Sequence, residues 1–410
     1  MKRLALALTL AALLAGCGAR SPVEGRVPGR TLRIYMSGSL SGASATSTRA
    51  AMRGAEMALR DHGPRIGRYR IQLTTLDDAA AQSDGWDPNQ TTLNARTAAQ
   101  DPTAIGYIGE FDSGASAISI PILNRAGVPQ VSAQGGAVGL TSDGPGRSPG
   151  EPAKYYPTGR RTFVRVVPTY AVEAAVEVSL EQTTGCRSAF VLQDGRVDGE
   201  DAAISFVLAA QAAGLRVLGV QSYEAQAGDY RSVGLAVAKL APSCVLLAAT
   251  DEHSAARVAA QVGAVDPSAS ILAASPLADP AFVDPELGGI PLSLDPRVFV
   301  LAPGLASSSY PRRGQEFLAR YARLYGSAPP QAIFGYEAMS LLLHAINVAT
   351  DHGRAQAVRA RVVQELFATR ERHSLLGTYS LDRDGDTSLR AYGIYRVKAG
   401  ALSFVAQERG

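Results

Sequence analysis

The chain of 410 residues lacks the motifs that mark most enzymes. It contains no G-x-S-x-G, S-x-x-K, H-E-x-x-H, Walker or C-x-x-C pattern, so no common nucleophile, phosphate loop or redox pair is visible. Its five histidines are scattered without metal-ligand spacing. We therefore predict a protein with no catalytic residues, no metal and no cofactor.

Neither sign of charge is in excess, since 40 Lys and Arg stand against 37 Asp and Glu. A balance this close to neutral gives no electrostatic footprint for nucleic acid or for an anionic membrane surface. Beyond residue 17 no uninterrupted apolar run is long enough to cross a bilayer. The remaining length can bury a large core and predicts two domains.

The first residues, MKRLALALTLAALLAGC, combine a basic start, an apolar run over 4 to 14 and small residues before Cys17. This pattern predicts an export signal over 1 to 16. LAGC also resembles the lipobox of bacterial lipoproteins, in which the Cys receives a diacylglycerol and becomes the new N-terminus. We expect a lipid anchor on Cys17 and a flexible tether over 17 to 30, on the extracytoplasmic side of a membrane. A plain secretory peptide with a chance Cys is the alternative.

Only Cys186 and Cys244 remain after Cys17, and each opens an apolar strand. If these strands are parallel neighbours, the two sulfurs lie at the same end of a sheet. An oxidising compartment then favours a disulfide, and the alternative is two buried free thiols.

From residue 31 short apolar strands alternate with helical stretches, which predicts a mostly parallel sheet with helices on both faces. The same organisation restarts after a Pro- and Gly-rich insert at 142 to 161. Two similar α/β lobes in series are therefore expected. Three helices, near 312 to 325, 333 to 350 and 355 to 369, should pack back on the first lobe, and a hairpin turning at 398 to 400 should close the chain.

Ligands of open α/β sheets bind outside the carboxyl ends of the strands, and a pocket between two lobes is a common site. We therefore expect the turns of the two lobes to face each other across a cleft. Those of the first lobe lie at 38 to 48, 110 to 116 and 132 to 137, and those of the second at 194 to 199, 250 to 253 and 274 to 279.

Two segments rich in acidic residues are better explained by helix capping and a surface turn than by catalysis or calcium binding. Acids at 77, 78, 84 and 87 allow paired-carboxylate catalysis, but two of them adjoin a helix start at Trp86-Asp87-Pro88, so helix capping is favoured. DRDGDTS at 382 to 388 alternates acids like a calcium loop, but its Gly falls between the second and third acids and the distal Glu is missing. We predict a tight surface turn there.

The chain resembles the type I periplasmic binding proteins of ABC importers, in particular the leucine/isoleucine/valine-binding group. The resemblance covers 31 to 405 and is carried by the order and spacing of SGSLSG, RGAEMAL, LDDAAAQ, YIGEFDSGASAISIPILNRAGVPQVSA, FVRVVPT, DPAF, FLARYARLYG, YEAMSLLLHAI and LGTYSLDRDGD…YGIYRV.

This resemblance implies an α/β fold of two Rossmann-like lobes with parallel sheets, joined by three crossover strands near 161 to 167, 297 to 303 and 376 to 382. The first lobe would comprise 31 to 160 and 304 to 375, and the second 161 to 303 and 376 to 410. It also implies no catalysis, only closure over a small solute.

The stretch YIGEFDSGASAISIPIL, at 107 to 123, runs from a strand through a Gly/Ser turn into a helix. Such a turn suits either an anion cradle or ordinary helix capping. The resemblance favours the cradle, because Ser113 matches the family's Ser that holds a ligand carboxylate. The residues that share this predicted role are Gly114, Ala115 and Ser116 after it, and Gln134, Gly135 and Gly136 in a second turn.

The departures from the family leave the solute class open. Gly136 stands where a Ser or Thr is common, and Asp198-Gly199 replaces an aromatic-Gly pair. The acid that meets a ligand ammonium falls at Ser275, so Asp198 and Asp251 are the candidate replacements, with Thr250 beside them. An amino acid held differently, a carboxylate without an amine, and an amide or polyol all remain open.

We expect a lipid-anchored, monomeric solute-binding protein whose partners are a small molecule and ABC permease transmembrane subunits, with no nucleic acid. A receptor subunit of the same fold that reports ligand to a signalling partner is the first alternative. An envelope hydrolase is the second, although no nucleophile-base pair supports it.

Overall fold

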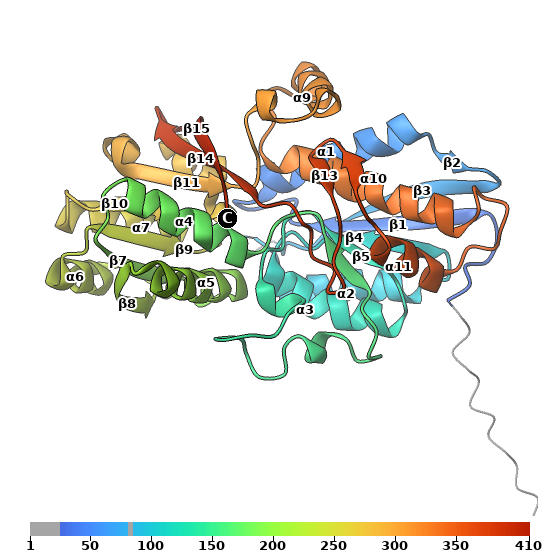
Figure 1. Ribbon diagram of the computed structural model, residues 1–410, viewed down its shortest axis with the longest axis horizontal. Coiled ribbons are helices and arrows are strands. Elements are labelled where there is room, and N and C mark those ends of the chain that lie inside the picture. The colour runs from blue at the N-terminus through green and yellow to red at the C-terminus, as the bar shows by residue number, and fades with distance from the viewer. Residues whose placement is uncertain (1–24, 81–84) are drawn as a thin grey trace, which may run out of the picture.

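A computed structural model describes residues 25 to 80 and 85 to 410 and shows two α/β lobes side by side (Figure 1). The predicted signal peptide, Cys17 and most of the tether lie outside the described residues, as does Asp84.

The first lobe is built on a six-stranded sheet in the order β2-β3-β1-β4-β5-β6. Its parallel strands are β1 (Thr31–Gly38), β3 (Tyr69–Asp77), β4 (Ala104–Ile108), β5 (Gln130–Ser132) and β6 (Phe163–Arg165), and β2 (Arg65–Ile66) is an antiparallel edge. Helices α1 (Ala45–His62), α2 (Pro88–Gln100) and α3 (Ser113–Arg125) connect them. As predicted, α9 (Arg312–Tyr325), α10 (Gln331–Ala349) and α11 (Arg359–Phe367) return to this lobe and share its core.

Helices α1 and α10 cross so closely that only glycine fits at two points. A Cβ on Gly54 would collide with the carbonyl oxygen of Ala332, and one on Gly335 with that of Ala51. Helix α10 is long and apolar enough to cross a membrane, but 72% of its apolar stretch is buried inside the protein. It is therefore a core helix of the first lobe, because neighbouring elements cover it.

The second lobe is built on a seven-stranded sheet in the order β15-β14-β11-β10-β9-β7-β8. Its strands are β7 (Ser188–Gln193), β8 (Arg216–Ser222), β9 (Cys244–Ala248), β10 (Ser270–Ala273), β11 (Val298–Ala302), β14 (Ala391–Lys398) and β15 (Ala401–Arg409). The first five are parallel, and β14 and β15 form the predicted terminal hairpin. Its helices are α4 (Tyr170–Thr183), α5 (Val197–Ala213), α6 (Arg231–Leu240), α7 (Glu252–Val265) and the short α8 (Pro280–Val283).

A disulfide joins Cys186 to Cys244, whose Cα atoms lie 5.8 Å apart. It forms because β7 and β9 are parallel neighbours that start at the same end of the sheet, as the sequence suggested. Within the described part of the chain, these two sulfurs and the Glu181 carboxylate make the one group with metal-ligand spacing. The disulfide removes both thiolates that a metal would require.

The chain passes between the two sheets three times, after β6, after β11 and after β13 (Gly377–Tyr379), which pairs with β12 (Arg372–Ser374). The predicted two-lobed fold with three crossovers is confirmed. The predicted domain boundary at 160/161 precedes β6, which still pairs with β5 of the first sheet.

Candidate functional site

The turns at the carboxyl ends of the two sheets face each other, as predicted from the strand order. The carboxylate of Asp279, after β10, accepts a hydrogen bond from the Ser47 hydroxyl at the start of α1. The carboxylate of Asp198, in the first turn of α5, reaches Ser113 at the start of α3. The two lobes are thus closed on each other, and the predicted site lies between them.

The Ser113 turn binds a carboxylate, but that carboxylate belongs to the protein itself. One oxygen of Asp198 accepts the backbone N–H of Ser113 at 2.8 Å and of Gly114 at 3.4 Å. Its other oxygen accepts the Tyr170 hydroxyl at 2.6 Å. The first N–H groups of a helix have no partner inside the helix and favour an anion, which explains the contact. Burial raises the pKa of Asp198, while these hydrogen bonds lower it.

The absence of a side chain at Gly136 makes room for this arrangement. A Cβ there would lie 2.7 Å from a ring carbon of Tyr170, closer than atoms of this kind approach. The Tyr170 N–H also donates to the Gly136 carbonyl at 2.9 Å. The ring of Tyr170, from the opposite lobe, therefore fills the space that a side chain at position 136 would need.

In the second predicted turn, at 134 to 136, two backbone N–H groups donate to a side chain of the protein and not towards the cleft. The N–H groups of Gln134 and Gly135 both donate to the Ser132 hydroxyl, at 3.3 and 3.0 Å. The Ser113 hydroxyl accepts the N–H of Ala137 at 3.1 Å. Ser116 is fully buried, and its hydroxyl has no partner among the described residues.

Ser275 occupies the predicted acid position, and an acid from another element meets it there. Its N–H and hydroxyl both donate to the carboxylate of Glu173, at 2.5 Å each. Glu173 lies in the first turn of α4 and is almost fully buried. Burial raises its pKa to about 7, opposed by hydrogen bonds from Ser275 and Tyr392. Glu173 was not predicted, because it lies about 100 residues along the chain from Ser275.

Thr250 and Asp251 make hydrogen bonds that stabilise the turn between β9 and α7 in the second lobe. One carboxylate oxygen of Asp194 accepts the N–H and hydroxyl of Thr250, at 2.7 and 3.0 Å, and the N–H of Asp251 at 3.3 Å. Asp251 caps α7 through the N–H of Ser254 at 2.8 Å and pairs with Arg196 at 3.3 Å. Both predicted side chains therefore have structural partners in this closed form.

A small cavity of about 20 Å³, room for about one water molecule, lies between the lobes. Gln134, Gly136 and Ser275 of the predicted site line it. Tyr170, Gln331, Phe334 and Tyr392, which the sequence analysis did not select, also line it. A larger apolar groove of about 790 Å³ runs between α9 and the β14–β15 hairpin, but none of the predicted site residues lines it.

The Pro- and Gly-rich insert at 142 to 161 reaches across the cleft. Arg147 pairs with Asp201 of α5 at 2.6 Å, and both side chains are more than nine-tenths buried. The same carboxylate accepts the N–H of Gly139 at 3.2 Å. Burial raises the pKa of Asp201, and the charge of Arg147 lowers it. The insert thus adds an ion pair that exists only while the lobes are closed.

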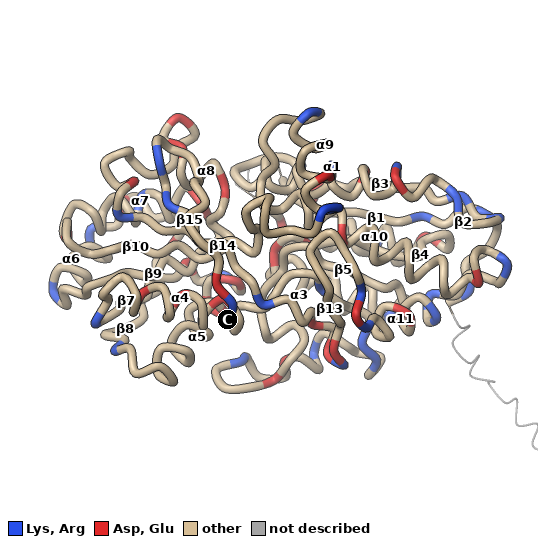
Figure 2. Tube along the Cα trace, turned by 45° about the horizontal axis from the view of Figure 1, so that its top comes forward, with Lys and Arg blue, Asp and Glu red and all other residues tan. Residues whose placement is uncertain are grey.

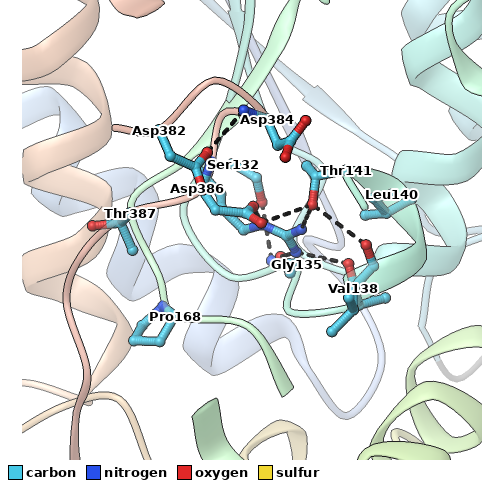
Figure 3. Close-up of polar contacts among 12 residues, drawn as sticks. Ser132, Gly135, Val138, Leu140, Thr141, Pro168, Asp382, Asp384, Asp386 and Thr387 are labelled. Carbon is cyan, nitrogen blue, oxygen red and sulfur yellow. Dashed lines mark hydrogen bonds and ion pairs between the residues drawn. The ribbon is translucent and has the colours of Figure 1, made fainter. Parts of the chain in front are cut away.

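The buried side chain of Arg165 stabilises the turn at 134 to 137 through its carbonyl oxygens. Arg165 of β6 donates to the carbonyl oxygens of Gly135 at 2.9 Å and Ala137 at 2.8 Å, and pairs with Asp386 at 2.6 Å. Figure 3 shows Asp386 and Thr141 converging beside Gly135. The turn predicted at 382 to 388 is confirmed, but its last acid neutralises this arginine. A lone Arg inside the apolar run FVRVVP was the signal that could have found it.

Of the acidic residues before α2, Asp87 caps the helix and Asp78 is buried next to another carboxyl group. Asp87 caps α2, accepting the N–H groups of Asn89 and Gln90 at 2.9 Å each, as predicted. Asp78 is instead buried beside Glu110, and its pKa is raised to about 8 by burial and then by the Glu110 charge. This pair of carboxyl groups was not predicted, because they follow β3 and β4 and meet only when both strands pair with β1.

Charge is not segregated over the surface, since Figure 2 shows both signs interspersed along the two lobes. This distribution agrees with the near-neutral composition.

A family model for "Periplasmic binding protein" matches residues 31 to 401. A search of curated protein sequences gave no match. Among solved structures, a leucine-binding protein, LivK, from Thermotoga maritima has a TM-score of 0.77 and 18% identity, covering 92% of this chain and 99% of its own. The LivJ branched-chain amino acid binding protein from Streptococcus pneumoniae, in complex with isoleucine, has a TM-score of 0.74 and 14% identity, covering 93% and 99%.

A solute-binding protein of an ABC transporter from Rhodopseudomonas palustris, in complex with 3,4-dihydroxybenzoic acid, has a TM-score of 0.71 and 16% identity, covering 93% of this chain and 98% of its own. At these identities the structures establish a shared fold. The family match spans both lobes and the crossovers between them. The chain therefore belongs to the periplasmic binding protein family, in its type I fold, as its sequence motifs had indicated.

Proposed function

We propose that this protein is a lipid-anchored solute-binding component of an ABC importer, which captures a small polar solute between its lobes and delivers it to a permease. The family match supports a binding role in place of catalysis. Structural neighbours are complexes with isoleucine, 4-hydroxybenzoate and benzoate, which supports an amino acid or a related carboxylate, and an amide stays in the proposed class. The LAGC sequence at Cys17 supports the anchor.

The observation that carries the proposal is the set of contacts across the cleft. Carboxylates of the second lobe, Asp198, Asp201 and Asp279, each meet donors of the first lobe at a turn. Separating the lobes breaks all of these contacts. A solute that binds between the lobes favours the closed state by its differential affinity for that state, and a permease can recognise the closed shape.

Solute binding is testable by thermal denaturation against amino acids, carboxylates, amides and polyols. A ligand that binds only the native state stabilises it by RT ln(1 + [L]/Kd), about 2.7 kcal/mol at one hundred times Kd. We expect one class to raise Tm without being consumed. Turnover of any solute would contradict the binding role, and binding without stimulation of the permease ATPase would favour the receptor alternative.

The anchor is tested separately by Cys17→Ser. The unchanged chain should fractionate with membranes and incorporate labelled fatty acid, and the variant should do neither. A variant that remains in the membrane fraction would contradict lipid attachment at this residue.

A further inference from the structure

The cradle that would hold a solute carboxylate is already filled. Asp198 takes the N–H groups of Ser113 and Gly114 and the hydroxyl of Tyr170, all of which are buried. A solute carboxylate would have to displace Asp198 and leave a second buried negative charge beside it. Two carboxylates in one buried site repel each other, so this exchange is unfavourable.

Carboxyl groups outnumber cations next to that cradle. Asp112, at the N-terminal cap of α3, makes no side-chain hydrogen bond to the helix it precedes. Of the titratable groups that act most strongly on it, three are carboxyl groups, Asp198, Asp78 and Asp194, and one is Arg196. Arg196 already pairs with the acid that caps α7. A cation placed between the lobes would favour the ionised forms of these carboxyl groups in the closed state.

The cavity of about 20 Å³ between the lobes is lined by two residues whose hydrogen-bond acceptors have no donor among the described residues. The side-chain carbonyl oxygens of Gln134 and Gln331 are both buried without a partner among the described residues, and both residues line the cavity. Gln331 is 93% buried, and its Nε2 donates across the cleft to the Ala278 carbonyl at 3.2 Å, which leaves its oxygen for another donor. An unsatisfied buried acceptor costs about 1–3 kcal/mol, so a donor is favoured there.

The size and walls of the cavity suit an ammonium group. Its volume holds about one water molecule, and a primary ammonium head is of similar size. Tyr170, Phe334 and Tyr392 add aromatic rings, whose faces attract cations. The Tyr170 hydroxyl links the cavity to the Asp198 carboxylate.

From these observations, and resting on the proposed solute-binding function, we propose that the solute is a primary amine whose ammonium head enters the cavity lined by Gln134 and Gln331, and that it needs no carboxylate. Asp198 supplies from within the chain the carboxylate that fills the cradle at Ser113. The three solute classes left open by the sequence are thereby replaced by a fourth, an amine.

The test uses matched probes on the purified full-length chain. Propylamine and 1,4-diaminobutane carry only ammonium groups, propionate carries only a carboxylate, and leucine carries both. We expect the amines to raise Tm by about 3 °C at one hundred times Kd and propionate to leave it unchanged. In Asp198→Ala, which frees the cradle, propionate should begin to raise Tm.

Two substitutions at one position separate the acceptor from the interlobe bond. Gln331→Leu and Gln331→Glu both lose the hydrogen bond to Ala278, but only the second keeps an acceptor. We expect the first to weaken amine binding about tenfold and the second to preserve or tighten it. Gln364→Leu on the exposed face of α11 is the matched control and should change nothing.

The outcomes distinguish this inference from the function on which it rests. If the unchanged protein binds propionate as tightly as propylamine, or leucine more tightly than propylamine, or if Gln331→Glu weakens amine binding as much as Gln331→Leu, the amine assignment is overturned and the solute-binding function stands. If no amine, amino acid, carboxylate, amide or polyol binds, both are overturned.

Discussion

Replacing Glu181 by Gln should stabilise the protein, and the gain should grow with pH. Glu181 lies on the buried face of α4, 2% exposed, and one of its carboxyl oxygens has no partner among the described residues. Burial raises its pKa from 4.5 to about 8, and a hydrogen bond from Ser270 opposes the rise. The folded protein therefore keeps this carboxyl protonated at neutral pH, whereas the unfolded chain ionises it.

The sign and the magnitude follow from that difference. Below pH 4.5 both states are protonated and the residue costs nothing. As the pH rises towards 8, only the unfolded state loses its proton, so the free energy of unfolding falls by about 1.4 kcal/mol per pH unit. The cost is about 1 kcal/mol at pH 5 and about 3 kcal/mol at pH 7. Gln has the same shape and does not titrate, so it should recover most of this energy.

Urea denaturation at pH 5 and pH 7 measures the effect as a change of midpoint at constant m. Glu200→Gln, on the exposed side of α5, is the matched control and should shift neither midpoint appreciably. If Glu181→Gln is no more stable than the unchanged protein at pH 7, or gains equally at both pH values, the reasoning from buried ionisation is wrong.

Three further perturbations address closure and stability. Gly136→Ala places a Cβ 2.7 Å from the Tyr170 ring and should destabilise the protein by about 1–3 kcal/mol in thermal denaturation; an unchanged Tm would contradict the packing argument. Arg147→Met leaves the buried carboxylate of Asp201 unpaired and should open the cleft, which small-angle scattering would detect as a larger radius of gyration. An unchanged radius would show that the Arg147–Asp201 ion pair does not hold the lobes closed. Reducing the Cys186–Cys244 disulfide, which closes a loop of 58 residues, should lower the unfolding free energy by about 4 kcal/mol, and a Cys186→Ala/Cys244→Ala double variant insensitive to reductant is its control.

The local sequence determined the elements and their order. Alternating apolar strands and amphipathic helices predicted both sheets, because side-chain periodicity is set by backbone geometry within a few residues. The helix over 312 to 325 was predicted at the bounds that α9 has, and the Asp87 cap followed from three adjacent residues. The disulfide could be suggested because parallel strands start at one edge.

The occupants of the site were decided by tertiary structure. The residues at Ser113 suited either an anion cradle or helix capping, and only the family resemblance favoured a cradle, for the carboxylate of a solute. It could not show that Asp198, 85 residues away, would supply the carboxylate, because that contact exists only when two lobes close. Glu173, Gln331 and Arg165 were missed for the same reason: a buried polar side chain is recognised by its partners, and those partners come from distant elements. The chain alone thus determined two α/β lobes and a Gly/Ser turn at the start of a helix, and the packing of one lobe on the other decided which groups remain to meet a solute.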